Sequence, residues 1–421
     1  MRLKWHADIL NGYAFKSEQF TDHGIPIVRQ SNLKSGKIIH DGKCYPSELV
    51  PSKFRLKVRD ICIGLSGSIE NFGIVDQRVL PCALNQRVGA LRAKKRKASS
   101  RYIEYLVQSV IFKHHVASNL PSTTIVNIDA GLVGNAPFPE VDLTTQRQIA
   151  DFLDRETARI DLLIEKREKF ASLVAEARDS LLARMICGEG PETLDTTRND
   201  WTDARPENWK SERAKVHFRE RIEKSVDGSE ELLTVSHITG VTTRAEKDVN
   251  MFLAESNEGY KIVHPSDIVI NTMWGWMGAM GASSHHGIIS PSYGVYRPTS
   301  DAFEREYLDL MLRSKPFIAE VTRRSKGIHS SRLRIYPDAF LDMRLPVPPR
   351  DEQVAILAEL RRRTERENAL LAKNEQASAL LKEYRSALIT AAVTGQVNVD
   401  TYTRRGRVDR QLDAIREEME T

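Results

Sequence analysis

Two segments of the chain end in the same way: RDSLLARMICGE, residues 178–189, and RSALITAAVTGQ, residues 385–396. Aligned at a separation of 207 residues, they are identical at three positions, which pair Arg178 with Arg385, Leu181 with Leu388 and Gly188 with Gly395. A glycine directly after an apolar-periodic run is typical of a helix C-terminus, because glycine readily adopts the left-handed conformation found there. The sequence therefore predicts two helices with matching ends.

The match at this separation extends through most of each half. DICI at 60–63 aligns with DIVI at 267–270, and Gln146 aligns with Gln353. A proline pair, PFP at 137–139, corresponds to PVP at 346–348, two residues out of step, and is expected to mark a break in the chain. The period is far longer than the roughly 20–50 residues of solenoid repeats. We interpret the chain as a duplicated two-part unit.

Each proline pair precedes a long stretch with helical periodicity and almost no glycine. In the first stretch, apolar residues recur in steps of three and four, which gives a narrow stripe. A helix of this length spans ~60 Å at 1.5 Å per residue and cannot bury the stripe against one small domain. We therefore expect the two helices to pack antiparallel on each other, with a globular domain at each end and pseudo-two-fold symmetry. Five polar residues interrupt the stripe: Glu156, Arg167, Arg363, Glu367 and Asn374.

The predicted fold is α+β, with two mixed α/β recognition domains separated by a long antiparallel two-helix coiled coil that forms an internal repeat. The predicted divisions are a first domain at 1–143, a long helix at 144–187, a polar linker at 188–209, a second domain at 210–349, a second long helix at 350–396 and a charged tail at 397–421.

Composition limits the classes of function. The 421 residues carry a formal net charge of +5, which is compatible with a polyanionic partner without requiring one. Four scattered cysteines suggest neither a zinc site nor a disulfide framework. The N-terminal residues lack the apolar core of a signal peptide, and no apolar run is long enough to span a bilayer. We expect a reducing, cytoplasmic setting and no membrane.

Motifs for catalysis or metal binding are not evident in the sequence. The glycine-rich stretches at 64–73 and 274–281 match neither a Walker A motif nor a dinucleotide fingerprint. NAPF at 135–138 is similar to the loop with which amino-methyltransferases hold a flipped adenine, but alanine replaces its first proline. The second half has RLPV at 344–347 in the same place, which favours a structural hinge. We expect no catalytic residues, no metal ligands and no enzymatic activity in this chain.

The doubled unit resembles the specificity subunit of type I restriction–modification systems. The resemblance rests on PFPEVDLTTQRQIADFLD (137–154) with LLARMICGE (181–189), and on PVPPRDEQVAILAEL (346–360) with LITAAVTGQ (388–396). It extends from the LKWHADILNG opening to about Val399, and NTMWGWMGAM (271–280) is similar to part of a target-recognition domain. DEQ at 351–353 is close to the usual family pattern, whereas Thr145 and Gln146 in the first copy depart from it.

The resemblance implies a set of roles and partners. Each globular domain would read one half of a split double-stranded DNA target, and the coiled coil would fix the spacing and dock two modification (methyltransferase) subunits. Those partners would bring S-adenosylmethionine, and restriction or translocase subunits would bring ATP and Mg²⁺. The resemblance implies no cofactor bound by this chain itself.

Candidate DNA contacts follow from charge and from turn position. Basic side chains are candidates for phosphate contact, with a solvated charge run as the alternative: Lys94, Lys95, Arg96, Lys97, Arg323, Arg324 and Lys326. Mostly polar residues near the glycine turns are candidates for base contact, with a structural role as the alternative: Arg29, Gln30, Ser31, Asn32, Ser66, Ser68, Gln86, Arg87, Ser236, His237, Asn271, Thr272 and Trp274. Trp274 and Trp276 are candidates for a groove wedge, or else for core packing.

Two other classes of function remain open at this stage. A coiled-coil scaffold that binds proteins and no DNA would explain the helices, but not two elaborate and diverged domains. A methyltransferase acting on its own would require binding of S-adenosylmethionine by the isolated chain. The DNA target, the length of its spacer and the role of the tail cannot be derived from the sequence, because readout depends on loop geometry and DNA shape.

Overall fold

The computed structural model describes residues 1–66, 71–119, 128–188, 201, 205–246, 256–327 and 333–402. The chain forms two compact units: unit 1 comprises Met1–Glu168 with Asn374–Thr421, and unit 2 comprises Lys169–Lys373. The units do not follow chain order, because each long helix begins in one unit and ends in the other. Most of the predicted linker (188–209) and tail (397–421) lies outside the described residues.

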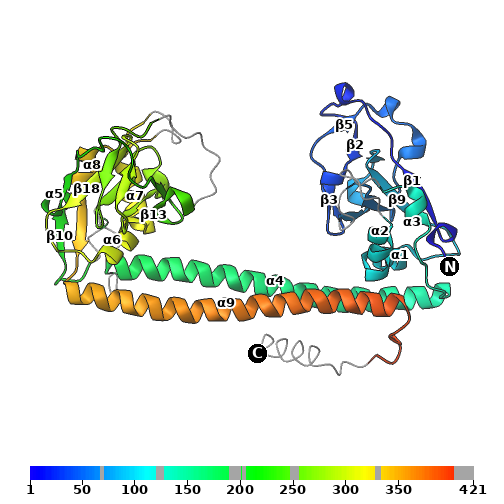
Figure 1. Cartoon of the computed structure of the whole chain (residues 1–421). Coiled ribbons are helices and arrows are strands. Elements are labelled where there is room, and N and C mark those ends of the chain that lie inside the picture. Colours follow the sequence, from blue (N-terminus) through cyan, green and yellow to red (C-terminus); the bar gives the residue numbers. More distant parts are fainter. Residues whose placement is uncertain are drawn as a thin grey trace. The chain divides into compact units, whose positions relative to one another are not determined.

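Unit 1 contains a four-stranded antiparallel sheet in the order β1 (Ala7–Asn11), β9 (Val88–Ala93), β6 (Ile61–Gly64), β7 (Phe72–Ile74) (Figure 1). All four residues of β6 are buried, as its continuous apolar run predicts. Beside it are a three-stranded sheet, β5 (Cys44–Tyr45), β2 (Ile25–Val28), β8 (Ala83–Leu84), and a hairpin, β3 (Leu33–Lys34) with β4 (Lys37–Ile38). Short 3₁₀ turns connect these strands: Leu3–Trp5, Ser17–Gln19, Gln30–Asn32, Ser47–Leu49, Ser52–Phe54 and Gln77–Val79.

Three short helices follow the sheet of unit 1: α1 (Ser100–Gln108), α2 (Val110–Ser118) and α3 (Ala130–Gly134). The hydroxyl of Ser109, between α1 and α2, donates to the carbonyl of Leu106 at 2.6 Å and accepts from the N–H of Phe112 at 3.4 Å. This residue therefore ends one helix and caps the next. The apolar face of α1 packs in one core with both long helices.

Unit 2 contains a second four-stranded antiparallel sheet, in the order β11 (Phe218–Glu220), β18 (Tyr293–Pro298), β15 (Ile268–Asn271), β16 (Met280–Ala282). Three strand pairs accompany it: β10 (Lys210–Arg213) with β19 (Arg344–Val347), β12 (Leu233–Ser236) with β13 (Gly240–Thr243), and β14 (Lys261–Val263) with β17 (Gly287–Ile289). The remaining short helical elements are α5 (Ala214–His217), α6 (Arg305–Leu312), α7 (Lys315–Arg324), α8 (Pro337–Leu341) and the 3₁₀ turns Arg244–Glu246 and Gly275–Met277.

The two sheets share more than their strand order. Strands β6 and β15 begin 207 residues apart, and each follows a residue with positive φ, Arg59 (70°) or Ser266 (72°). The intervening carboxylates, Asp60 and Asp267, are buried at 1% and 0% exposure. Each carboxylate accepts two hydrogen bonds from one guanidinium, and each also accepts a backbone N–H three residues earlier. Pairing with an arginine compensates the cost of burying these charges.

The arginines come from different places in the two units. Arg92 lies in β9 and binds Asp60 at 2.6 and 2.8 Å, whereas Arg221 follows β11 and binds Asp267 at 2.7 and 3.1 Å. The hydrogen bond with Asp60 raises the pKa of Arg92 above its usual value. The same acid position is thus neutralised from two different strands.

The two long helices are α4 (Leu143–Cys187) and α9 (Arg350–Val393) (Figure 1). Asp142 begins α4: its carboxylate accepts the N–H of Thr144 at 2.8 Å and the hydroxyl of Thr145 at 2.6 Å. These hydrogen bonds, the one from the Thr145 hydroxyl first, lower the pKa of Asp142. At the other ends of the helices, Gly188 and Gly395 have φ of 75° and 72°, as the sequence predicted. Gly395 donates to Ala392 and Gln396 donates to Ala391, which closes the C-terminus of α9.

Within unit 1, α4 and the end of α9 run antiparallel. Arg167 contacts Asn374, whereas Asp161 contacts Arg385, so residue numbers rise on one helix as they fall on the other. Arg167 and Asn374, two of the polar residues that interrupt the apolar stripe, bond to each other through two hydrogen bonds of 3.0 and 3.1 Å. Within unit 2, the end of α4 packs in the same core as the first turns of α9.

In each unit one short helix, α1 or α6, is joined to the long helices in the same way. The buried side chain of Gln146 accepts a hydrogen bond from the N–H of Ser99, just before α1, and donates to the carbonyl of Val141. In unit 2, the buried side chain of Gln353 accepts from the N–H of Glu304, just before α6, and donates to the carbonyls of Ala302 and Pro348. In addition, the hydroxyl of Tyr102 (α1) donates to the carbonyl of Val393, and that of Tyr307 (α6) donates to Ile186. Each hydroxyl satisfies a carbonyl in the last turn of a long helix.

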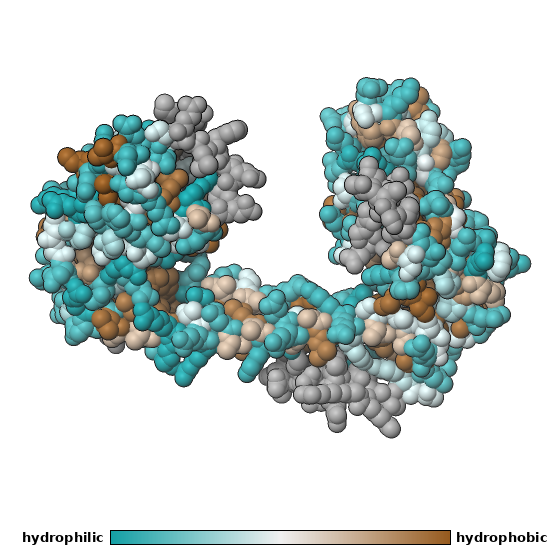
Figure 2. Space-filling model, viewed as in Figure 1, coloured by the Kyte–Doolittle hydropathy of each residue, from teal (hydrophilic) through white to brown (hydrophobic). Residues whose placement is uncertain are grey.

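The proline pairs do not simply interrupt the chain. Pro346 and Val347 lie in β19, which pairs with β10, and Pro137 forms a bridge to Arg2. At the predicted break, the chain therefore forms a short strand in unit 2 and a single bridge in unit 1. Among the described residues, no helix is both long and apolar enough to cross a membrane. Hydrophobic residues lie among hydrophilic ones on the visible faces of both units (Figure 2).

Candidate nucleic-acid interface

In unit 1, three separate turns meet where β6 ends. The side-chain amide of Gln30 donates to the carbonyl of Ser66 and accepts the Ser66 hydroxyl. The N–H of Leu65 donates to the carbonyl of Arg87 at 2.9 Å, which brings the turn before β9 to the same place. Ser31, Gln86 and Arg87 are exposed there. The structure thus gathers five of the predicted base-contact residues; Ser68 lies outside the described residues.

Two other candidates in unit 1 have structural partners. Asn32 is 2% exposed; its carbonyl oxygen accepts the N–H of Arg29 at 2.8 Å and its amide donates to Ile39 at 2.9 Å. The guanidinium of Arg29 forms an ion pair with Asp41. Burial opposes ionisation of Asp41, but the charge of Arg29 outweighs it and the pKa is lowered. Asn32 therefore holds a turn and, in this conformation, presents no polar group to a base.

The basic run 94–97 follows β9, whereas Gln86 and Arg87 precede it. The two groups are separated by the strand, roughly 20 Å at about 3.4 Å per residue. Lys94 donates to the carbonyl of Lys4 at 2.7 Å and lies 3.5 Å from Asp8. Lys95, Arg96 and Lys97 are exposed. A phosphate contact by this run would lie well away from the turn at the end of β6.

In unit 2, the corresponding strand β15 leads into a tight turn. Asn271 accepts the backbone N–H groups of Met273 (3.1 Å) and Trp274 (3.2 Å), and donates to the hydroxyl of Tyr293. Thr272 donates to the carbonyl of Ser292. Asn271 and Thr272 thus shape the turn, whereas Trp274 is 52% exposed. Trp276 is partly buried, and its indole N–H donates to Met273 at 3.0 Å. The two tryptophans therefore have different roles.

The hairpin between β12 and β13 lies beside this turn. A Cβ built on Gly278 would come within 3.9 Å of the Cβ of His237. Ser236 closes the hairpin, with its hydroxyl 3.0 Å from that of Thr239, while His237 is exposed. Of these two candidates, only His237 extends freely from the surface.

The cations at the end of α7 are partly neutralised. Glu320 is 6% exposed and binds both Arg323 (2.6 and 2.7 Å) and Arg324 (2.5 Å). Burial opposes ionisation of Glu320, but these hydrogen bonds lower its pKa. Lys326 is exposed, and its backbone pairs with that of Arg334. The sequence analysis did not include Arg334, because two arginines separated by a leucine, at 332 and 334, do not form a continuous basic run.

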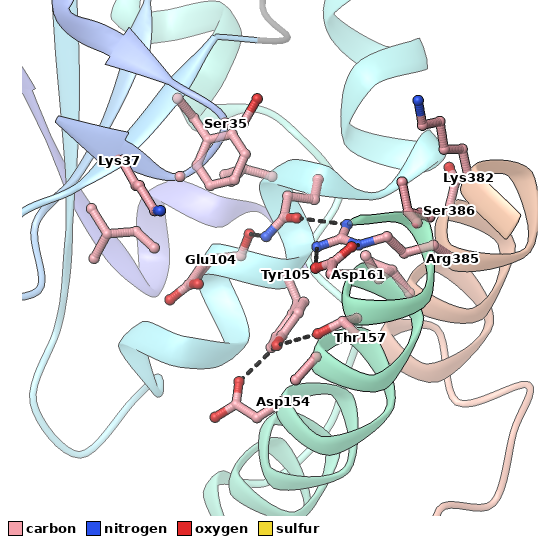
Figure 3. A pocket seen from close by; sticks show the side chains of 18 of the residues that line it. Ser35, Lys37, Glu104, Tyr105, Asp154, Thr157, Asp161, Lys382, Arg385 and Ser386 are labelled. Atoms are coloured by element: carbon pink, nitrogen blue, oxygen red, sulfur yellow. Dashed lines mark hydrogen bonds and ion pairs between the residues drawn. The ribbon is translucent and has the colours of Figure 1, made fainter. Parts of the chain in front are cut away.

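A groove lies beside the helix pair in each unit, and the sequence analysis identified neither. The groove of unit 1, about 740 Å³, lies between α1, the β3–β4 hairpin, α4 and the end of α9 (Figure 3). Tyr105 donates to Asp154 at 2.7 Å, and Arg385 binds Asp161 at 2.7 and 3.1 Å across it. Glu104 lies in the same groove, and burial raises its pKa.

The groove of unit 2, about 350 Å³, occupies the corresponding position between α4, α6 and α9. Several lining residues are 207 positions apart in the two grooves: Thr157 and Thr364, Asp154 and Arg361, Arg178 and Arg385, Leu182 and Ile389. Five leucines line the second groove, together with charged side chains: Leu181, Leu182, Leu310, Leu357 and Leu360. Both grooves therefore combine apolar and charged side chains, and the leucines are concentrated in the second.

Residues 2–169 match the family model described as the type I restriction modification DNA specificity domain. Over this region the chain is similar to the type I restriction–modification specificity family. The resemblance stated from the repeated motifs is confirmed.

The chain is similar to curated specificity subunits, but only over part of the length of each. The chain is 28% identical over 188 residues to the StySPI specificity subunit of Salmonella potsdam, covering 43% of this chain and 40% of that protein. It is 24% identical over 184 residues to the EcoBI specificity subunit of Escherichia coli, covering 43% of this chain and 37% of that protein. The chain thus spans less than half the length of these relatives.

A solved structure concerned with complex assembly and conformational transition of the type I R-M system matches the fold. Its TM-score is 0.60 at 18% identity, over 94% of this chain and 97% of that one. The chain therefore shares its fold, with mixed helices and strands and long helices, with a protein of a type I R-M system. Among the described residues, no group of three or more His, Cys, Asp or Glu side chains is placed to hold a metal ion.

Proposed function

We propose that this chain is the DNA sequence-specificity subunit of a type I restriction–modification complex, and that it binds a bipartite, asymmetric DNA target. The observation that carries the proposal is the pair of equally ordered sheets, β1-β9-β6-β7 and β11-β18-β15-β16, whose equivalent strands β6 and β15 end in different turns. Two domains that share a sheet but differ in their surface turns can each recognise a different half of a DNA target.

The turn at the end of β6 supplies the chemistry for base contact in the first half-site. Arg87 and Gln86 are exposed side chains of the types that bind guanine or adenine through two hydrogen bonds. Gln30 and Ser66 hold one another beside them, which fixes the turn. Lys95, Arg96 and Lys97 would contact phosphates farther along the duplex, and phosphate contacts supply affinity rather than specificity.

We assign the two grooves beside the long helices to the two modification subunits. Their lining residues are related by the same separation of 207 residues as the rest of the repeat, so one kind of partner can occupy both. The paired helices would then act both as a docking surface and as a spacer between the recognition domains. Restriction or translocase subunits would join this core.

Catalysis is assigned to the partners and none to this chain. The modification subunits would bind S-adenosylmethionine and methylate the DNA, and the restriction subunits would bind ATP and Mg²⁺. In this arrangement, the residues of this chain select the sequence and hold the partners in place. A chain that bound S-adenosylmethionine on its own would contradict this assignment.

The test is a gel-shift titration and a methylation map of a strain that expresses the chain with its modification subunits. We expect one bipartite methylated sequence, and binding that weakens steeply as salt rises, since phosphate contacts release counterions. A mixture lacking the chain serves as the control and should methylate no defined sequence. The competing function, a scaffold that binds no DNA, predicts assembly with partners but no shifted DNA.

A further inference from the structure

The turn after β15 exposes a group of large apolar side chains. Met273 is 40% exposed, Trp274 is 52% exposed and Met277 is 37% exposed, all within one turn. Isolated apolar residues on a surface need no explanation, and Figure 2 shows many of them. Three adjacent ones that include an indole are a different case, because such clusters mark binding sites.

Hydrogen bonds fix the backbone of this turn at several points. The N–H of Trp274 donates to both the carbonyl and the side-chain oxygen of Asn271, and the carbonyl of Trp274 accepts from Met277 and Ala279. The hydroxyl of Thr322, in α7, donates to the carbonyl of Trp276 at 3.2 Å. The indole of Trp274 is therefore presented at a fixed place, which reduces the entropy lost on binding.

The core packs closely against the glycines of this turn. A Cβ on Gly275 would lie 3.1 Å from Ile335, and one on Gly278, with φ of 87°, would lie 2.6 Å from Ile318. Trp276 is partly buried and its indole N–H is bonded to Met273, whereas Trp274 is 52% exposed.

Cations lie next to the exposed group. A guanidinium nitrogen of Arg334 is 3.5 Å from the sulfur of Met273, and Lys326 pairs with Arg334 through the backbone. Both side chains are exposed, and within the described part of the chain neither forms an ion pair. Arg323 and Arg324 follow on α7, with Glu320 as their shared counter-ion. An apolar surface bordered by positive charge fits a nucleic acid, with phosphates at the rim and bases at the centre.

We infer that Trp274, flanked by Met273 and Met277, inserts as an apolar wedge against the stacked bases of the half-site read by unit 2, while Arg334 and Lys326 bind the adjoining phosphates. This inference rests on the proposed function and specifies how one recognition domain carries it out. Unit 2 then selects its half-site partly by how readily a base step opens, which favours flexible pyrimidine–purine steps. The exposed Arg87 and Gln86 of unit 1 read by hydrogen bonds instead.

The experiment compares Trp274→Ala, Trp274→Phe and Trp5→Ala in the full chain assembled with modification subunits. Trp5 is also 52% exposed but lies in unit 1, so it controls for loss of a surface indole. Trp274→Ala should weaken DNA binding on the order of tenfold, the loss expected for one base–aromatic stack. Trp274→Phe should retain most of the binding, and Trp5→Ala should bind as the wild type does.

Two further measurements identify the mode of contact. In the methylation map, Trp274→Ala should relax one step of a single half-site and leave the other half-site unchanged. 2-Aminopurine placed at that step should brighten when the wild type binds and stay quenched with Trp274→Ala. The slope of affinity against salt should not change, because no phosphate contact is removed.

The possible failures are distinguishable. If the wild-type complex methylates no defined sequence, the proposed function fails and the wedge with it. If the wild type methylates normally and Trp274→Ala gives the same map and affinity, only the wedge is wrong. The variant could also assemble with fewer modification subunits than the wild type and yet bind DNA normally once assembled. In that case the turn is a protein-docking surface, and the wedge is likewise wrong.

Discussion

Strand β6 of unit 1 and strand β15 of unit 2 hold the same place in equivalent sheets, yet they lead into opposite kinds of turn. After β6, Gln30 and Ser66 bond to each other beside the exposed Arg87. After β15, the polar Asn271 is used to build the turn, and Trp274 projects from it. The first turn offers hydrogen-bonding groups to a partner, whereas the second offers an apolar surface.

This difference separates what the repeat preserves from what it allows to vary. The features that both units share are buried. They are the aspartates Asp60 and Asp267, the glutamines Gln146 and Gln353, and the tyrosines Tyr102 and Tyr307. The side chains that differ between the two turns include exposed ones, Arg87 and Trp274, where a substitution has little effect on folding. Recognition can therefore diverge on a fixed framework.

The largest expected effect comes from exchanging one whole domain. Replacing residues 211–340 with the matching segment of another specificity subunit should replace one half-site completely and leave the other unchanged. The reason is that each unit presents its own turns on its own sheet. A methylation map of the chimera measures this. Simultaneous change of both half-sites would show that the domains do not read independently.

A change in the spacing between half-sites should follow from lengthening the helices. Four residues inserted within 150–180 add about 6 Å, roughly two base pairs at 3.4 Å each. Because α4 and α9 pair antiparallel within unit 1, a matching insertion in α9 should restore packing where a single insertion weakens it. The methylation map should show a longer gap with unchanged half-sites; altered half-sites would contradict the role of the helices as spacers.

The buried acids should be equally important for stability although their arginines come from different strands. Asp60→Ala and Asp267→Ala should each lower the free energy of unfolding by about 3–5 kcal/mol, because each leaves a guanidinium without its buried partner. Chemical denaturation of each variant measures this. Asp227→Ala, in an exposed turn, is the control and should cost less than about 1 kcal/mol. Unequal losses of unfolding free energy would mean that the position from which the arginine reaches the aspartate affects stability.

A smaller effect is expected for the buried glutamines. Gln146→Ala and Gln353→Ala should each lower the free energy of unfolding by about 2 kcal/mol, since each frees a backbone N–H at the start of α1 or α6. Hydrogen exchange should then speed up in the first turn of that helix alone. Faster exchange in both units from one substitution would show that the two junctions are coupled.

The smallest effect concerns the charged groove of unit 1. Because burial raises the pKa of Glu104, the fold favours its neutral form and is weakened as pH rises through that pKa. Glu104→Gln should therefore raise the Tm by ~1 °C at neutral pH, a difference that vanishes in acid, where the wild-type carboxyl is also neutral. The control, Gln108→Glu, places a carboxylate beside the guanidinium of Arg385 and should not lower the Tm at neutral pH. A Tm difference that persisted in acid would contradict the role of burial.

Sequence reasoning was accurate where structure is local. Glycine at 188 and 395 predicted the left-handed helix ends, and the three-and-four spacing predicted both long helices. For polar side chains the structure adds what the sequence could not show: Asn32 and Asn271, which were proposed as base contacts, each hold a turn through hydrogen bonds. An asparagine beside a strand end has the same sequence signature in either role, because only its hydrogen-bond partners distinguish them.

The sequence by itself determined the two long helices with their glycine ends and the resemblance to the specificity family, because periodicity and glycine ends are properties of residues near one another in the chain. The tertiary structure alone decided which guanidinium neutralises each buried aspartate, which side chains line each groove and which tryptophan is exposed. Those choices depend on contacts between residues far apart in sequence, such as Tyr102 with Val393. No local pattern records them, since hydrogen bonding and burial are settled only when the chain has packed.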